Sequence, residues 1–211
     1  MSSPIHQHAA PLHLGASLET ARLAVILLHG RGSSAANIMG LAHELGGSDV
    51  AYLAPQATNG SWYPFTFLAP LSHNEPFLSA ALAAVATLIA QVEAAGIPAE
   101  RIVLGGFSQG ACLSSEFLAR NPRRYGGLLA FSGGLIGPPG TPRDYPGDLA
   151  GTPAFIGCSD VDSHIPLARV TETADVLGRL GAQVKLQIYP GMGHTINDDE
   201  LHHARVSLGL G

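Results

Sequence analysis

The sequence predicts a single α/β domain in which helices cover both faces of a mostly parallel sheet. The chain has 211 residues, a length typical of one domain and sufficient to bury a sizeable core. Short apolar runs alternate along it with longer segments whose apolar residues recur at helical spacing. The short runs are apolar throughout, which is typical of parallel strands buried on both faces. Strands and helices in this alternation form doubly wound domains with right-handed crossovers.

Each element can be assigned to a stretch of the chain. Strands are expected at Leu23–Leu28, Val50–Ala54, Ile102–Leu104, Leu128–Phe131, Ala154–Ile156 and Val184–Tyr189. Helices are expected roughly at Ala35–Leu45, Pro76–Ala95, Gln109–Arg120 and Pro166–Leu180. Residues 1–20 are predicted to form an N-terminal tail or an edge strand, and residues 21–211 the domain itself.

The composition argues against nucleic acid as a partner and says little about oligomeric state. The net charge is −5, and the 11 basic residues form no basic run. Neutralising phosphates needs clustered Lys and Arg, so nucleic-acid binding is not expected. Charged residues make up 13% of the chain, roughly half of the usual ~25%. This low charge favours an apolar site or a self-association face, which allows a homodimer.

The cysteines and apolar segments indicate a soluble protein of a reducing compartment. Cys112 and Cys158 each lie in an apolar stretch and are expected to be buried free thiols. The first residues lack the charged start and apolar core of a signal peptide. The longest apolar run, Phe77–Ala90, is shorter than the ~18–20 residues of a membrane span. We therefore expect a cytoplasmic protein with no membrane span.

Long connections follow some of the predicted strands and point to the location of a site. They are Pro55–Asn74, Gly133–Thr152 and Pro190–Asn197. All of them leave from the carboxyl ends of strands, which is the edge where open α/β sheets bind ligands. The site is therefore expected at that edge.

The strongest motif is the pentapeptide from Gly106 to Gly110, which fits the pattern G-x-S-x-G around Ser108. It follows a predicted strand and opens a predicted helix, the context that a nucleophile elbow requires. Glycines two residues before and after Ser108 let the strand and helix approach closely. The alternative is a serine that merely caps the helix. A serine nucleophile needs a base and an acid, and in this fold class they follow it as acid and then histidine.

Candidates for the base and the acid lie downstream of Ser108. His194 follows the last predicted strand in a loop shaped by Gly and Pro, whereas His202 and His203 fall in the final helical stretch and His164 in the preceding loop. His194 is therefore the expected base. Asp162 is the expected acid because it lies just upstream of a helix start at Pro166, and Asp160 is the alternative.

A Gly-rich turn after the first predicted strand, His29-Gly30-Arg31-Gly32, can direct backbone N–H groups toward Ser108. The N–H groups of Arg31 and Gln109 are the expected oxyanion donors. The alternative, a phosphate-binding loop, lacks the Lys-Ser/Thr of a P-loop. Trp62 and Tyr63 lie in an aromatic stretch of the first long connection and either line a substrate pocket or pack that connection down. The scattered histidines indicate no metal site.

With these motifs the chain resembles the phospholipase/carboxylesterase family of α/β-hydrolases, which includes acyl-protein thioesterases. The resemblance covers nearly everything after residue ~20 and rests on LLHGRGSS, GGFSQGACLSSEFL, GCSDVDSHIP and YPGMGHTI. It implies a single-domain α/β-hydrolase fold, with Ser108 as nucleophile and His194 as base. It favours Asp162 over Asp160, because the family's acid stands four residues before a proline. It implies Arg31 as the second oxyanion donor and no cofactor.

The sequence is compatible with three functions. The first is a carboxylesterase that cleaves small to medium acyl esters through an acyl-enzyme on Ser108. The second keeps the same residues and changes the substrate to an acyl thioester or a lysophospholipid. The third is a non-catalytic binding module on a hydrolase fold, since fold alone does not fix function.

Overall fold

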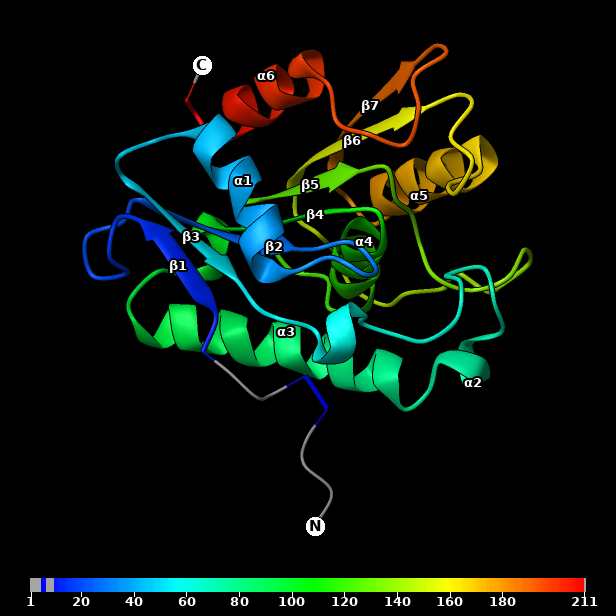
Figure 1. Cartoon of the computed structure of the whole chain (residues 1–211), viewed down its shortest axis with the longest axis horizontal. Coiled ribbons are helices and arrows are strands. Elements are labelled where there is room, and N and C mark those ends of the chain that lie inside the picture. The colour runs from blue at the N-terminus through cyan, green and yellow to red at the C-terminus, as the bar shows by residue number, and fades with distance from the viewer. Residues whose placement is uncertain (1–4, 7–9, 211) are drawn as a thin grey trace.

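The computed structural model describes residues 5–6 and 10–210, and these form a seven-stranded sheet between two layers of helices (Figure 1). The strand order is β1-β3-β2-β4-β5-β6-β7, and every neighbouring pair is parallel except β1 with β3. The strands are β1 Leu12–Gly15, β2 Leu23–Leu28, β3 Val50–Ala54, β4 Ile102–Phe107, β5 Gly127–Phe131, β6 Pro153–Ser159 and β7 Gln183–Tyr189. The predicted fold class is confirmed.

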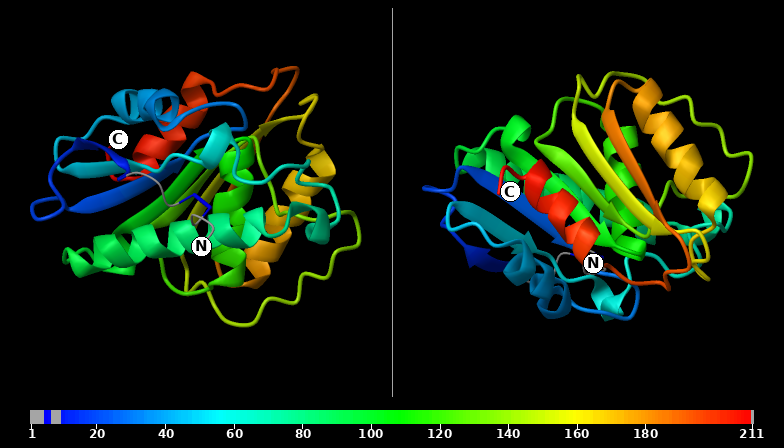
Figure 2. Two further views of the ribbon diagram at one scale, coloured as in Figure 1. Left: turned by 60° about the horizontal axis from the view of Figure 1, so that its bottom comes forward. Right: turned by 90° about the horizontal axis from the view of Figure 1, so that it is seen from above.

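Helices cover both faces of the sheet, as Figure 2 shows. Helices α1 and α6 pack on one face, and α3, α4 and α5 on the other. The bounds are α1 Ala35–Leu45, α2 Leu71–Asn74, α3 Phe77–Ala94, α4 Gln109–Arg120, α5 Leu167–Arg179 and α6 Asp198–Ser207. Single 3₁₀ turns lie at η1 Thr58–Gly60 and η2 Ala99–Arg101.

Strand β2 shows why the sequence pattern is continuous rather than alternating. Ala24, Ile26 and Leu28 belong to the core on the α3–α4–α5 side, whereas Val25 and Leu27 belong to the core on the α1–α6 side. Successive side chains of a strand point to opposite faces, and here both faces are covered. The side chains of β2 therefore alternate between the two faces of the sheet. Because both faces are buried, every residue of the strand is apolar.

The N-terminal part supplies the antiparallel edge of the sheet. Strand β1 pairs with β3, with Leu12 opposite Ala54 and Gly15 opposite Ala51. Gly15 has φ +83°, and a Cβ there would meet the carbonyl oxygen of Val50 at 2.2 Å. The chain can turn away from the sheet at this point only because residue 15 has no side chain. Residues 1–4 and 7–9 of the predicted tail lie outside the described residues.

Helix α3 is apolar and, by its 18-residue length and composition alone, could span a bilayer. In the structure one face of it belongs to the main hydrophobic core. The buried residues of that face are Leu78, Ala81, Ala84, Val85, Leu88, Ile89 and Val92. They repeat at intervals of three and four, the spacing of a helix that packs against a sheet.

The connection between β5 and β6, residues 132–152, contains no described helix or strand but is anchored to α4. The anchor is Glu116, which is 1% exposed. Its carboxylate accepts hydrogen bonds from the Ile136 backbone at 2.9 Å and from the Tyr145 hydroxyl at 3.2 Å. Arg120, four residues later on α4, pairs with the same carboxylate at 2.6 Å. A buried carboxylate satisfied in this way fixes a long loop without regular structure.

Candidate active site

Ser108 lies between β4 and α4 with φ +56° and ψ −117°, a backbone conformation that is rare for any residue except glycine. A Cβ at Gly106 would lie 2.5 Å from the Gly110 carbonyl carbon, and a Cβ at Gly110 would lie 1.9 Å from the Leu28 carbonyl oxygen. Both glycines are therefore required for β4, α4 and β2 to approach one another. This is the sharp turn expected from the sequence.

The turn also leaves a backbone donor beside the serine. The Ser108 N–H donates to the Phe131 carbonyl at 3.0 Å, which ties the turn to β5. Gln109 is the first residue of α4, and a first N–H has no acceptor within its own helix. The Gln109 N–H and the positive end of the α4 dipole are therefore available to an oxyanion.

His194 and Asp162 form a short hydrogen-bonded pair beyond the carboxyl ends of β6 and β7. The His194 Nδ1–H donates to Asp162 Oδ2 at 2.7 Å, and the Asp162 side chain is fully buried. The other oxygen, Oδ1, accepts the backbone N–H groups of His164 at 2.8 Å and Ile165 at 3.0 Å. Burial opposes ionisation of this carboxyl, but these hydrogen bonds outweigh it and lower the pKa of Asp162. An ionised Asp162 fixes the tautomer that leaves Nε2 of His194 free to accept a proton.

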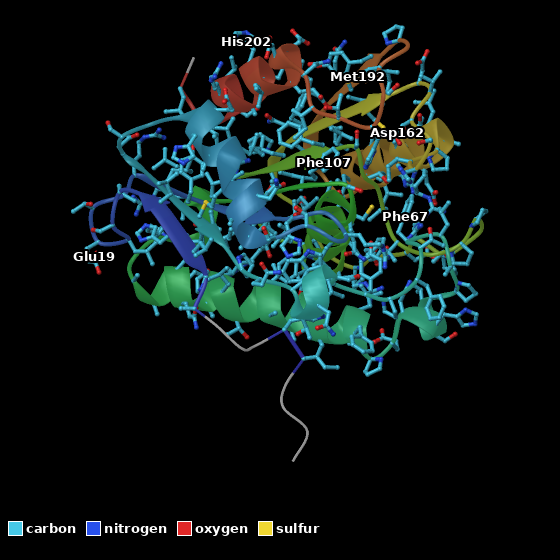
Figure 3. All side chains as sticks on the ribbon, in the orientation of Figure 1. Glu19, Phe67, Phe107, Asp162, Met192 and His202 are labelled. Carbon is cyan, nitrogen blue, oxygen red and sulfur yellow. The ribbon has the colours of Figure 1, made fainter. Side chains whose placement is uncertain are left out.

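Asp160, the alternative candidate for the acid, binds the backbone of a neighbouring loop. Its Oδ1 accepts the Gly191 N–H at 2.8 Å, so it ties the β6–α5 loop to the loop of His194. Asp162, by contrast, accepts backbone N–H groups from its own loop, those of His164 and Ile165. Ser159 adds a second tie, because its hydroxyl donates to the Met192 carbonyl. In Figure 3, Asp162 and Met192 lie near each other beyond the ends of their strands.

Two rings enclose the imidazole of His194. Phe107, the last residue of β4, lies with its ring centroid 4.7 Å from that of His194. His164 meets the same imidazole edge to face at 4.8 Å. Aromatic contacts at these distances restrict how a ring can tilt. His164, another of the histidines that the sequence offered as a base, therefore lies against His194.

A cavity of about 700 Å³ brings the separate parts of the site together. Ser108 and His194 both line it, and so do Gly30, Arg31 and Gln109 from the expected oxyanion region. Further lining residues are Ser33, Asn37, Tyr63, Pro64, Phe65, Thr66, Phe67, Phe107, Cys112, His164 and Ile165. The carboxyl edge of the sheet is therefore hollowed at the predicted position.

Of the two aromatic residues expected in the pocket, the structure brings only Tyr63 to it. Trp62 is fully buried, and its indole N–H donates to the His29 carbonyl at 2.9 Å. Phe65 and Phe67 line the cavity as well. Adjacent residues of an irregular loop point in different directions, so the aromatic stretch both lines the cavity and packs the loop down.

His29 supports the turn at Gly30 and Arg31, a role that the sequence did not reveal. Its ring is buried, with Nδ1–H donating to the Gly30 carbonyl at 2.8 Å and Nε2 accepting the Ala57 N–H at 3.1 Å. Burial lowers the pKa of His29, so the ring stays neutral and keeps this hydrogen-bond pattern. The turn at Gly30 is thereby fixed against the first long connection.

The first long connection is held over the site by side-chain amides. Gln109 accepts the Trp62 N–H at 3.0 Å and donates to the Tyr63 carbonyl at 2.9 Å. Asn74, which is fully buried, accepts the Phe65 N–H at 2.8 Å and donates to the Thr66 carbonyl at 3.1 Å. Nothing in the sequence around Asn74 marks it, because its partners are set by tertiary structure.

The cysteines and His203 are among the other side chains with reactive or metal-binding groups considered from the sequence. Cys112 and Cys158 are free and buried as predicted, and burial raises the pKa of each thiol to about 12. His203 contacts Lys185 and Asp199 on the far side of β7. Among the described residues no group of three His, Cys, Asp or Glu side chains is placed to hold a metal ion.

A parallel sheet with a nucleophile elbow at its centre and a His–Asp pair at its carboxyl edge defines an α/β-hydrolase. A family model described as Phospholipase/Carboxylesterase matches residues 15–210, so the chain belongs to that family. An acyl-protein thioesterase 1 from Eremothecium gossypii is 30% identical over 94% of each chain. A phospholipase/carboxylesterase structure from Dyadobacter fermentans is 44% identical, with a TM-score of 0.90 over 98% of this chain and 99% of that one. Esterase PE8 is 27% identical, with a TM-score of 0.78 over 95% and 97%.

Proposed function

We propose that this enzyme, a hydrolase of carboxylic esters, works through Ser108 as nucleophile, His194 as general base and acid, and Asp162 as the acid that orients the imidazole. The backbone N–H groups of Arg31 and Gln109 form the oxyanion hole. The observation that carries the proposal is the shared cavity. It contains a strained serine and an imidazole that donates to a buried, ionised carboxylate at 2.7 Å.

The chemistry follows from those positions. His194 Nε2 removes the Ser108 proton as Oγ attacks the ester carbonyl, and the developing oxyanion accepts hydrogen bonds from the two backbone N–H groups. The C–O bond to the alcohol breaks as His194 returns the proton to the leaving oxygen. Water, activated by the same imidazole, then hydrolyses the acyl-enzyme and restores Ser108.

The proposal is tested on a chromogenic ester such as 4-nitrophenyl butyrate. Ser108→Ala is expected to lower kcat by about 10⁴-fold or more, since such a change removes the nucleophile while the fold remains. A fluorophosphonate probe should label the wild-type protein once and leave the variant unlabelled. Wild-type turnover by the variant would refute Ser108 as the nucleophile. If the wild-type protein neither reacts with the probe nor turns over esters, the hypothesis of a non-catalytic binding module would be favoured instead.

A thioester substrate is the second candidate, and the similarity to acyl-protein thioesterases favours it. Oxyanion hole and nucleophile serve esters and thioesters alike, so the two substrates differ mainly in what the cavity accommodates. Its apolar lining residues, including Phe65 and Phe67, suit an acyl chain, and Phe65 is 53% exposed. An acyl-chain series with matched alcohol and thiol leaving groups separates the two by kcat/KM.

The expected partner is a small acyl ester, and we propose a reducing compartment such as the cytoplasm as the location. Both cysteines are free and buried, which is the arrangement that a reducing compartment maintains without disulfides. Cell fractionation of the tagged protein tests the location. Sedimentation tests whether two copies associate.

A further inference from the structure

Besides Ser108, Gln109 and the two histidines, the residues that line the cavity fall mainly into two groups. The larger group is apolar or aromatic and comes from the first long connection and the ends of β4 and β6. The second group comes from one short stretch after β2, namely Arg31, Ser33 and Asn37. This stretch adds polar side chains, with hydrogen-bond donors, at one part of the cavity, next to the apolar and aromatic residues.

Arg31 carries the one permanent charge among the described residues that line the cavity, and none of those residues is an aspartate or glutamate. Its guanidinium donates to Ser61 Oγ at 3.2 Å, to the Pro64 carbonyl at 2.7 Å and to the Phe65 carbonyl. All three acceptors are uncharged. Arg22 forms an ion pair with Asp49, but among the described residues Arg31 has no carboxylate partner. Its charge therefore remains available to a ligand.

The guanidinium is also held in place before any ligand binds. Three hydrogen bonds fix it to the loop of residues 61–65, and it lies 5.7 Å from the centre of the Tyr63 ring. Arginine has five N–H donors, so donors remain for a carboxylate. A prepositioned donor loses little conformational entropy when a ligand binds.

Arg31 is close to Ser108 in space, because it directly follows Gly30, which lies against Ser108. A Cβ built at Gly30, the preceding residue, would lie 3.5 Å from the Ser108 Cβ. A side chain that starts one residue later can meet a group only a few bonds from the ester carbonyl. Ser33 and Asn37 lie on the same stretch, and the Ser33 hydroxyl donates to Asn37 Oδ1 at 3.0 Å. This bond leaves the Asn37 amide N–H groups as further neutral donors.

We infer that the enzyme selects acyl esters that carry a carboxylate a few carbon atoms from the ester bond, with the Arg31 side chain as the specificity-determining group. The inference rests on the proposed function and adds the chemical class of the substrate. The whole chain carries a net charge of −5, so attraction of an anion must be local to the cavity. A carboxylate on the acyl part or on the alcohol part would present the same chemistry to Arg31.

The test compares matched anionic and neutral esters. The first arm places the carboxylate on the acyl side, with 4-nitrophenyl hemisuccinate and hemiglutarate set against their methyl esters. The second arm places it on the leaving group, with the butyrate ester of 4-hydroxy-3-nitrobenzoic acid set against its carboxamide. The wild-type enzyme is expected to prefer the anionic member of one arm by about tenfold or more in kcat/KM, the contribution of one charge-assisted hydrogen bond.

Substitution of Arg31 tests the origin of the preference. Arg31→Gln keeps N–H donors for the loop carbonyls and removes the charge, so the anionic-to-neutral ratio should fall by about tenfold. Arg31→Lys should retain part of the ratio. Arg124→Gln is the matched control, because it makes the same charge change at a residue that donates to Ala150 before β5 begins, at the opposite edge of the sheet. Its ratio should equal that of the wild type.

The outcomes separate this inference from the proposed function. Equal or better turnover of the neutral esters by the wild type, or a ratio unchanged in Arg31→Gln, would overturn selection by Arg31 while the enzyme remains a Ser108 hydrolase. No turnover of any ester and no labelling of Ser108 by the fluorophosphonate would overturn the proposed function instead. Thermal melts of both Arg31 variants establish that they are folded, and the ratio is measured within each variant.

Discussion

The two carboxylates of the β6–α5 loop have different partners, although only one residue separates them. Asp162 is buried and accepts the imidazole N–H of His194 together with two backbone N–H groups. Asp160 accepts the Gly191 N–H and is exposed. In the proposed mechanism Asp162 therefore sets the tautomer of His194, whereas Asp160 holds the loop that carries His194 in position.

This difference predicts different effects of the same substitution. Asp162→Asn should lower kcat by roughly 10³–10⁴-fold, because an amide stabilises the wrong tautomer and cannot stabilise the imidazolium. Asp160→Asn retains an oxygen acceptor for Gly191 and should lower kcat by less than about tenfold. Steady-state kinetics on 4-nitrophenyl butyrate measures both. A larger loss in the Asp160 variant would assign the acid role to Asp160.

The residue scale also shows what the sequence could identify. Ser108, Asp162 and His194 each lie in a local pattern with a physical reason, a G-x-S-x-G turn, a carboxylate before a helix-opening proline and a Gly-Pro loop after a strand. His29 and Asn74 have no such pattern. Their importance depends on partners 28 and 9 residues away, namely the backbone of Ala57 and of Phe65.

At the scale of elements, the long core segments were predictable and the short ones were not. Strands β2 and β3 and helices α1 and α4 have the predicted bounds, because burial on a sheet leaves a continuous or helical apolar pattern. Helix α2 and turn η1 lie in the first long connection, where no helix was predicted. A four-residue helix has too few residues to show a period, and α2 is held by the hydrogen bonds of Asn74.

The elbow joins three elements, and its glycines set how closely they pack. A Cβ at Gly110 would lie 1.9 Å from the Leu28 carbonyl oxygen, so Gly110→Ala must push α4 away from β2. We expect it to lower the free energy of unfolding by about 2–3 kcal/mol or more, the cost of an overpacked core. Urea unfolding followed by circular dichroism measures this change.

The control is Gly40 in α1, where a Cβ would meet nothing within 4 Å. Gly40→Ala should raise the free energy of unfolding by about 0.5–1 kcal/mol, because alanine loses less backbone entropy in a helix. If both substitutions cost the same, close packing at Gly110 is not what the elbow requires.

At the scale of the whole molecule, the proposed site depends on four distant stretches that meet at one edge of the sheet. The turn after β2, the elbow after β4 and the loops after β6 and β7 are brought together by the parallel pairing of β2, β4, β5, β6 and β7. Stability and site geometry are therefore linked, since a change in how α6 packs also shifts the loop of His194 that leads into it.

Glu200 lies at the start of α6, where the loop of His194 leads into that helix. It closes a capping box with Asn197 at the start of α6, its side chain is fully buried, and its Oε1 has no hydrogen-bond partner among the described residues. Oε1 lies 2.2 Å from where a Cβ at Gly157 would be, so the carboxyl packs directly on β6. Burial raises the pKa of Glu200 to about 7, well above that of a free glutamate.

This pKa predicts a loss of stability as the pH rises. Below about pH 4.5, the pKa of Glu200 in the unfolded chain, Glu200 is protonated in both states, and its titration does not change the free energy of unfolding. Between about 4.5 and 7 the unfolded chain releases the proton and the folded protein keeps it, so the free energy of unfolding falls by about 3 kcal/mol from this group. Asp162, whose pKa is lowered, loses its stabilising charge only at more acidic pH.

Glu200→Gln tests this directly, because the amide oxygen can still accept the Asn197 N–H but cannot ionise. The variant should equal the wild type near pH 4.5 and exceed it increasingly up to pH 7, since ionisation of all other groups is common to both proteins. Urea unfolding across this range measures the difference. A constant difference at every pH would mean that Glu200 is ionised in the folded protein throughout. The capping box would then stabilise α6 through the carboxylate rather than in spite of it.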